Sequence, residues 1–154
     1  MAKKAKRHLI IGAGTAGANA IRTLRQSGNT DEIVLVSAEM PYSRMVLPYY
    51  LEQSISEAHT VTLSANQLEQ WGVETHFGRR ATALDTKANK VTLDNGDDLE
   101  YDDLLIATGS SAVRLNLPGS DLEGVYSFWT MADAKALSRH VSPDSHVVMV
   151  GAGS

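Results

Sequence analysis

A glycine-rich phrase occurs twice in this chain, as HLIIGAGTAG at residues 8–17 and as HVVMVGAGS at residues 146–154. In both copies an apolar run leads directly into Gly-Ala-Gly. Glycines at this spacing allow a tight turn between a strand and a helix, and they let the backbone approach a pyrophosphate closely. The phrase therefore predicts a βαβ unit that binds a dinucleotide, and its repetition predicts two such units. The second copy stops at Ser154, before any helix, so we expect the chain to be the front part of a larger protein.

The residues around the first copy have the pattern that such a unit requires. Residues 7–12 are typical of a buried strand, and Ile21 and Leu24 mark the apolar face of a helix that begins near Gly17 and ends at Gly28. Residues 33–36 predict a second buried strand. The order strand, glycine turn, helix, strand is that of a βαβ unit.

The following segments predict further elements. Ser64 with Gln67 three residues later indicates a helix start, and residues 73–77 predict a third strand. Apolar residues alternate on both sides of Asn95-Gly96, which predicts an antiparallel hairpin closed by a type I′ turn. Residues 102–109 predict another buried strand.

The C-terminal part predicts the beginning of a second unit. Thr130 with Asp133 indicates the start of a short helix through Leu137, and residues 147–150 predict a strand. We therefore expect an α/β fold: a Rossmann-like domain with a central parallel sheet, an inserted antiparallel meander, and the start of a second dinucleotide-binding domain. The boundaries we expect are 1–114 for the first domain and 115–154 for the incomplete second one.

Composition excludes several classes of site. The net charge is −4, with 18 acidic against 14 basic residues, and no arginine-rich run occurs, which argues against nucleic acid as a partner. The chain has no cysteine, so disulfides, thiolate metal sites and cysteine-based redox relays are excluded within it. Its five histidines lack the spacing of metal ligands, so we expect no metal. The sequence contains no run of about 18 apolar residues, so it predicts no membrane-spanning helix.

The N-terminus resembles a targeting segment. Basic residues from Lys3 to Arg7 precede the apolar run 9–11, and the small residues 18–20 resemble a cleavage site. Cleavage there would remove the glycine turn, so we expect a cytoplasmic protein, with export as the alternative.

Glu39 is the candidate ribose-binding residue. It lies just past the second predicted strand and 22 residues after Gly17. An acidic side chain at this place accepts hydrogen bonds from the two ribose hydroxyls of a dinucleotide and disfavours a 2′-phosphate. The alternative is an ordinary solvated glutamate in a loop.

Together these residues resemble a known family. The resemblance rests on GAGTAG, Glu39, the PYSRMVLPYYL stretch at 41–51, the hairpin insertion, LLIATGS at 104–110 and the second Gly-Ala-Gly. The chain is similar over its whole length to flavin-dependent pyridine nucleotide oxidoreductases with two dinucleotide-binding domains. That family includes NADH oxidases, CoA-disulfide reductases, rubredoxin and ferredoxin reductases, and nitrite reductase flavin domains.

The resemblance implies FAD as cofactor, NAD(P)H as the hydride donor, and a set of cofactor-binding residues. Those that would surround the FAD are Gly12, Gly14, Thr15, Ala16 and Gly17 at the pyrophosphate, Glu39 at the ribose, Arg44 as a nearby cation, Ala81 at the adenine, and Ala107, Thr108 and Gly109 along the dinucleotide. For Ala81 a purely structural role is the alternative. Gly151 and Gly153 would begin the NAD(P)H site.

Two departures from the family pattern limit the chemistry, and we assign no catalytic residue. Met45 stands where CoA-disulfide reductases and NADH oxidases place a redox cysteine, so thiol chemistry is excluded there. Tyr49 stands near the position of a lysine in ferredoxin-reductase-like members. A third difference, which does not limit the chemistry, is Trp129: it stands where many relatives have an arginine and marks either an altered contact or local packing. The reaction that the resemblance still implies is hydride transfer from a nicotinamide to the flavin, and the sequence does not identify the electron acceptor.

We therefore expect an FAD-dependent oxidoreductase that passes electrons to a redox partner protein or a small-molecule acceptor. The alternatives are a non-catalytic dinucleotide-binding or interaction module and an NAD-only dehydrogenase. In the family, the last FAD-binding strand follows the nicotinamide domain, so we expect this chain alone to retain FAD weakly or not at all and to be inactive. We also expect apolar surface at the sheet edge and at residues 147–150 to favour homo-oligomers.

Overall fold

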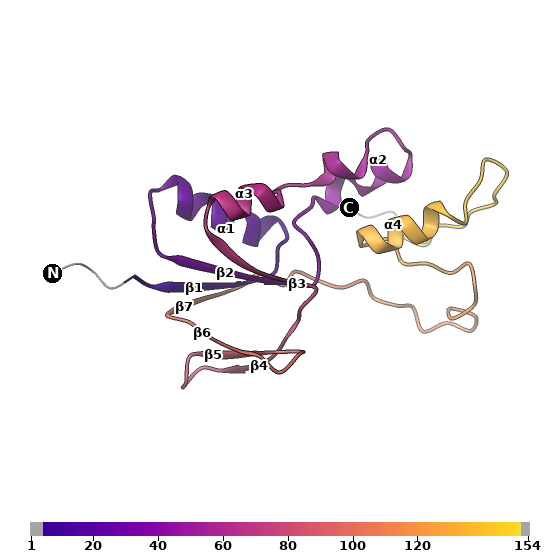
Figure 1. Ribbon diagram of the computed structural model, residues 1–154. Helices are drawn as coiled ribbons and strands as arrows, with labels where there is room; N and C mark the ends of the chain where they lie inside the picture. The colour runs from indigo at the N-terminus through magenta and orange to yellow at the C-terminus, as the bar shows by residue number, and fades with distance from the viewer. Residues whose placement is uncertain (1–4, 152–154) are drawn as a thin grey trace. The chain divides into compact units, whose positions relative to one another are not determined.

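The computed structural model describes residues 5–151 (Figure 1). Lys3, Lys4 and Gly153, which figure in the predictions above, lie outside the described residues. The chain forms two compact units. The first comprises residues up to 43 together with 57–110, and the second comprises 44–56 together with the residues from 111 onward.

The first unit is built on a parallel sheet with the strand order β3-β2-β1-β7. Its strands are β1 (Arg7–Ile11), β2 (Glu32–Ser37), β3 (Val73–Phe77) and β7 (Asp103–Ile106). The helix α1 (Thr15–Gln26) connects β1 to β2, and α3 (Ala65–Gln70) precedes β3. Ile10 pairs with Leu35 on one side and with Leu105 on the other. The predicted βαβ unit and the parallel sheet are confirmed.

Each face of this sheet is covered by a different layer (Figure 1). Successive side chains of a strand point to opposite faces. Ile10 and Leu35 therefore pack against Ile21 of α1 and the helix layer, whereas Leu9 and Val34 pack against the antiparallel sheet. These strand residues are at most 2% exposed. Burial on both faces explains why β1 and β2 are continuous apolar runs rather than alternating ones.

The second layer is a three-stranded antiparallel sheet of β4 (Ala81–Asp85), β5 (Lys90–Leu93) and β6 (Asp98–Glu100). The hairpin between β5 and β6 confirms the inserted meander. Its turn is not the predicted type I′, because Gly96 has a positive φ of 89° and Asn95 does not. Leu93 accepts a hydrogen bond from Gly96 N and donates one to Asp97 O, which makes a three-residue loop with a glycine bulge.

The helix starts follow local sequence signals. Ser64 caps α3 by accepting a hydrogen bond from Gln67 N, as predicted. Thr130 and Asp133 form a reciprocal capping box at α4 (Met131–Ser138). The first unit also contains a short 3₁₀ helix, η2 (Glu57–Thr60).

The second unit contains η1 (Arg44–Val46), α2 (Leu47–Leu51) and α4. The helices α2 and α4 pack together within it. Ala134 is fully buried, and Leu47 and Met131 are nearly so. None of the helices in the described part of the chain has the length and apolar character needed to cross a membrane.

The prediction of a strand at residues 147–150 is wrong. Their side chains are exposed, Val148 by 90% and Met149 by 81%. A strand needs a neighbour to satisfy its backbone N–H and C=O groups, and no described residue pairs with this segment. The edge strand β7 also exposes apolar side chains, since Leu105 is 39% and Ile106 is 58% exposed.

Candidate dinucleotide-binding site

The glycine turn lies at the carboxyl edge of the parallel sheet. Gly12 N donates to Val36 O at 2.8 Å, and Ala107 N donates to Ile11 O at 2.8 Å, so the ends of β1, β2 and β7 meet here. From β1 the chain runs outward through β2 and β3 and then returns to β7 on the other side. Open parallel sheets bind ligands at such a reversal of strand order.

Two of the three glycines of the motif are required by close packing. Gly12 has a φ of +109°, and a Cβ there would overlap the carbonyl oxygen of Ala107. A Cβ on Gly17 would overlap the carbonyl oxygen of Gly12. At Gly14, by contrast, no atom lies within 4 Å of an added Cβ. Gly12 and Gly17 thus close the turn, and Gly14 leaves open space in front of it.

The N-terminus of α1 is suited to an anion. The first N–H groups of a helix have no partner within the helix and carry its positive dipole end. Gly14 is the N-cap and has no side chain to accept from them, and the first turn of α1 contains no acidic residue. Thr15 and Ala16 are exposed. The turn therefore fits a pyrophosphate, which would accept hydrogen bonds from these groups.

Glu39 lies at the same edge, in the loop that follows β2. Its Oε2 accepts a hydrogen bond from the hydroxyl of Tyr42 at 3.0 Å. Ser37, the last residue of β2, accepts hydrogen bonds at its Oγ from Glu39 N and from Ala13 N, both at 3.3 Å. One hydroxyl thus ties the backbone of Glu39 to the glycine turn.

Ser37 and Tyr42 are not among the residues predicted from the sequence. In the sequence, the feature that could have pointed to Ser37 is a small hydroxyl residue at the predicted carboxyl end of a strand, which the fold places beside the glycine turn. Tyr42 stands three residues after the acidic residue, which is close enough for a local hydrogen bond. Neither signal is specific without the parallel register of β1 and β2.

The structure also brings the ATG segment to the glycine turn. Ala107 abuts Gly12 through its carbonyl group. Thr108 is exposed, and Gly109 is exposed with a φ of +68°. The chain leaves β7 here, so Ala107 and Thr108 lie beside Gly12, and Gly109 follows them.

Ala81 and Arg44 have other surroundings. Ala81 is the first residue of β4, where it packs against the core between the two sheets. Arg79 N donates to Ser37 O at 3.3 Å, which places the chain just before Ala81 beside the end of β2. Arg44 belongs to the second unit. There its guanidinium carbon lies 5.1 Å from the centroid of the Trp129 ring, a cation–π contact.

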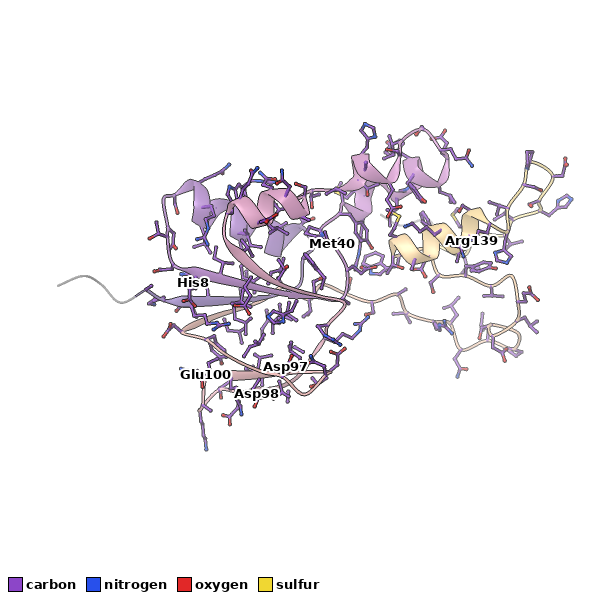
Figure 2. All side chains as sticks on the ribbon, in the orientation of Figure 1. His8, Met40, Asp97, Asp98, Glu100 and Arg139 are labelled. Carbon is purple, nitrogen blue, oxygen red and sulfur yellow. The ribbon has the colours of Figure 1, made fainter. Side chains whose placement is uncertain are left out.

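The opposite edge of the sheet carries a network of ion pairs around His8, which is labelled in Figure 2. His8 contacts Asp31 through Nε2 at 3.2 Å and Asp103 through Nδ1 at 3.1 Å. Lys6 bonds to Asp103 at 3.0 Å, which lowers the pKa of Asp103 and raises the pKa of Lys6. The backbone N–H of Lys6 lowers the pKa of Asp31. These contacts tie the starts of β1 and β7 to the chain before β2.

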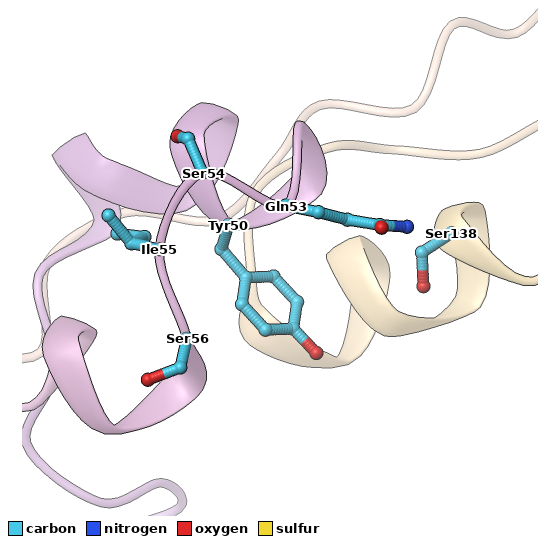
Figure 3. A pocket seen from close by; sticks show the side chains of 6 residues that line it. All are labelled: Tyr50, Gln53, Ser54, Ile55, Ser56 and Ser138. Carbon is cyan, nitrogen blue, oxygen red and sulfur yellow. The ribbon is translucent and has the colours of Figure 1, made fainter.

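A small hollow of about 300 Å³ lies in the second unit (Figure 3). Polar, uncharged side chains and one isoleucine line it: Tyr50, Gln53, Ser54, Ile55, Ser56 and Ser138. Gln53 adopts a positive φ of 65° where the chain leaves α2. Among residues 5–151 no group of three histidine or carboxylate side chains is arranged to hold a metal ion.

Comparison with known proteins shows the family. The sequence pattern of the pyridine nucleotide-disulphide oxidoreductases matches residues 6–154. The chain belongs to this family. It is 34% identical over 146 residues to the ferredoxin--NAD(+) reductase component of the biphenyl dioxygenase system of Paraburkholderia xenovorans, and 34% identical over 148 residues to rubredoxin-NAD(+) reductase of Pseudomonas putida.

These family members are longer than the chain. Each of the two alignments covers 94% of this chain but only 36% and 38% of the relative. The fold also matches the crystal structure of the ferredoxin reductase for the CYP199A2 system of Rhodopseudomonas palustris, with a TM-score of 0.82 and 27% identity over 87% of this chain and 34% of the other. The chain thus spans about a third of the length of these proteins.

Proposed function

We propose that this chain provides the FAD-binding part of a flavin-dependent NAD(P)H oxidoreductase. The observation that carries the proposal is the open, uncapped N-terminus of α1, which lies at the edge of the sheet where Ser37 holds the Glu39 backbone. The family supports it, because its members with similar sequences include ferredoxin and rubredoxin reductases that use NAD(+).

In this proposal each group has a separate task. The glycine turn at residues 12–17 surrounds the FAD pyrophosphate, the first N–H groups of α1 donate hydrogen bonds to it, and Glu39 accepts hydrogen bonds from the adenosine ribose. Residues 107–109 flank the dinucleotide. Ala81 meets the adenine through its backbone, and Arg44 supplies a cation near the cofactor. Bound FAD supplies the hydride-accepting chemistry, while the protein orients it and excludes competing reactions.

We propose that the electrons leave by way of the flavin to a separate acceptor. With no cysteine in the chain, and with Met45 exposed in η1, no dithiol can relay them within these residues. Since similar family members are a ferredoxin reductase and a rubredoxin reductase, we propose a ferredoxin- or rubredoxin-type protein as the acceptor class. A small-molecule acceptor is the other class. We assign no side chain of this chain to the chemical step.

The remaining assignments belong to the same proposal. Residues 1–114 form the FAD-binding domain, and 115–154 begin the NAD(P)H-binding domain, whose glycine turn starts at Gly151. We propose a location in the cytoplasm, and the place of residues 7–11 in the central strand β1 argues against the cleavage site considered at residues 18–20. The exposed apolar residues of β7 favour self-association.

Ligand binding by the chain tests the proposal. The purified protein is titrated with FAD, followed by flavin fluorescence, and with ADP as a competitor that contains only the adenosine diphosphate half. Saturable FAD binding that ADP displaces supports the proposal, even if it is weak. If millimolar FAD and ADP both fail to bind, the chain has no adenine dinucleotide site and the non-catalytic alternative is favoured.

A further inference from the structure

Tyr42 makes a direct contact with the side chain of Glu39. Its hydroxyl donates a hydrogen bond to Oε2 at 3.0 Å, and both side chains are half-buried. The two residues belong to one short loop after β2, in which Met40 is exposed (Figure 2). Hydrogen bonds from a hydroxyl to a carboxylate are stronger than those between neutral groups. This contact therefore restrains the direction of the carboxylate as well as its position.

The backbone of Tyr42 is itself fixed by the neighbouring chain. Tyr42 pairs with Val61 in an isolated antiparallel bridge. On either side of this bridge, Ser43 N donates to Thr60 O at 2.8 Å and Thr62 N donates to Pro41 O at 3.1 Å. Two flanking hydrogen bonds and the fixed φ of a proline leave the loop little freedom at this residue.

The segment that pairs with Tyr42 is anchored in turn. Thr60 is 1% exposed, and its hydroxyl donates to Glu57 O at 2.7 Å. Arg22 of α1 donates to Thr62 O at 2.9 Å and to Asn19 Oδ1 at 2.8 Å. Because α1 begins at the glycine turn, these contacts connect the frame around Tyr42 to the helix that would bind the pyrophosphate.

We infer that Tyr42 is a positioning residue, which holds the Glu39 carboxylate in the orientation that meets the ribose hydroxyls of an adenine nucleotide. The inference rests on the proposed function and adds to it a residue that sets how well the site recognises the ribose. A free glutamate must be ordered when the ligand binds, and that ordering weakens binding by about 2- to 12-fold. The Tyr42 contact removes this cost before the ligand arrives.

The test separates ribose recognition from binding in general. Wild type and Tyr42→Phe are titrated by NMR with ADP and with 2′,3′-dideoxy-ADP, which lacks both ribose hydroxyls. The ratio of the two dissociation constants measures the discrimination that Glu39 supplies. Tyr42→Phe should reduce this ratio by about 2- to 12-fold and leave the affinity for the dideoxy nucleotide unchanged.

Two further variants serve as controls. Tyr101→Phe removes the hydroxyl of a residue that lies between β6 and β7, just before the start of β7 at the opposite edge of the sheet, and should keep the wild-type ratio. In a Glu39→Ala background, Tyr42→Phe should change neither affinity, because the carboxylate it positions is absent. In the ligand-free protein, three-bond couplings should show that the Glu39 side chain averages over more rotamers in Tyr42→Phe than in wild type.

The outcomes distinguish this inference from the proposed function. If wild type prefers ADP and Tyr42→Phe keeps the full preference, or loses affinity for both nucleotides equally, Tyr42 does not position Glu39. An effect of Tyr42→Phe that persists in the Glu39→Ala background overturns the inference as well. If wild type binds both nucleotides equally, the assignment of Glu39 to the ribose is wrong, and the inference falls with it.

Discussion

Substitution of Gly14 offers the sharpest separation of folding from ligand binding. Gly14 is the N-cap of α1, with an extended backbone (φ −67°, ψ −171°) and no atom within 4 Å of an added Cβ. An aspartate there can accept a hydrogen bond from the first turn and meets the positive end of the helix dipole. Gly14→Asp should therefore stabilise the fold, by about 0.5 kcal/mol, which corresponds to a rise in Tm of about 1–2 °C.

The same carboxylate should oppose a bound pyrophosphate. It occupies the N–H groups that the ligand needs, and for the estimate we assume a separation of about 5 Å between its charge and that of the nearest phosphate. At an effective dielectric constant near 20, this repulsion is about 3 kcal/mol, or roughly a 100-fold loss of ADP affinity. Gly14→Asn has nearly the same shape and caps the helix without the charge, so it should lose much less affinity.

The assay compares the three proteins in two measurements. Calorimetric melting gives the change in stability, and NMR titration with ADP gives the change in affinity at low salt, where charge repulsion is least screened. The expected result is a Gly14→Asp protein that melts no lower than wild type and binds ADP much more weakly than Gly14→Asn does. Equal ADP affinities of the two variants would show that the phosphate does not lie at the N-terminus of α1.

Three further predictions concern the packing of the glycine turn, the Ser37 link and the ion pairs of the opposite sheet edge. Gly12→Ala should reduce the free energy of unfolding by about 3 kcal/mol in urea denaturation. Gly28 also has a positive φ, of +80°, but open surroundings, so Gly28→Ala should reduce it by only about 1–2 kcal/mol. Equal losses in the two variants would contradict the close packing at the turn. Ser37→Ala removes an acceptor shared by two backbone N–H groups, so it should cost about 1–2 kcal/mol and weaken ADP binding; unchanged ADP affinity would show that this link does not matter for the site. Since the folded protein lowers the pKa of Asp31 and Asp103 below 3.8, their stabilising effect is present above that pH and is lost as the pH falls through the folded values. The urea concentration at the midpoint of unfolding should therefore decrease as the pH falls through this acid range, and it should decrease less in Asp103→Asn. A midpoint that increases as the pH falls would contradict the stabilising role of these ion pairs.

The βαβ core could be predicted from the sequence because its signals are local. The apolar runs of β1 and β2, the glycines between β1 and α1, and the cap at Ser64 each depend on a few neighbouring residues. The hairpin was predictable for the same reason, but its turn type was not. Asn95-Gly96 is compatible with two loop lengths, and the register of β5 against β6 decides between them.

The strand predicted at residues 147–150 shows the limit of an apolar run as a signal. An apolar run indicates that a segment prefers to be buried, but a strand also requires a neighbouring strand whose backbone groups pair with its own. Among residues 5–151 this partner is absent, so Val147 to Val150 remain exposed coil.

The candidate site could be predicted only in part. Gly12, Gly17 and Glu39 have fixed spacings along the chain, so a pattern can find them. Ser37 and Tyr42 act through hydrogen bonds whose meaning depends on which strand ends lie together and on the pairing of Tyr42 with Val61. Those contacts arise from the tertiary structure, and no local pattern encodes them.

The central claim is that the turn between β1 and α1 holds the diphosphate of an adenine nucleotide. Backbone amide shifts recorded during an ADP titration of the isotope-labelled chain test it most directly. The largest shifts should occur at residues 12–17, and smaller ones should occur at Glu39 and at residues 107–109. Saturable shifts confined to other parts of the chain, with residues 12–17 unmoved, would contradict it.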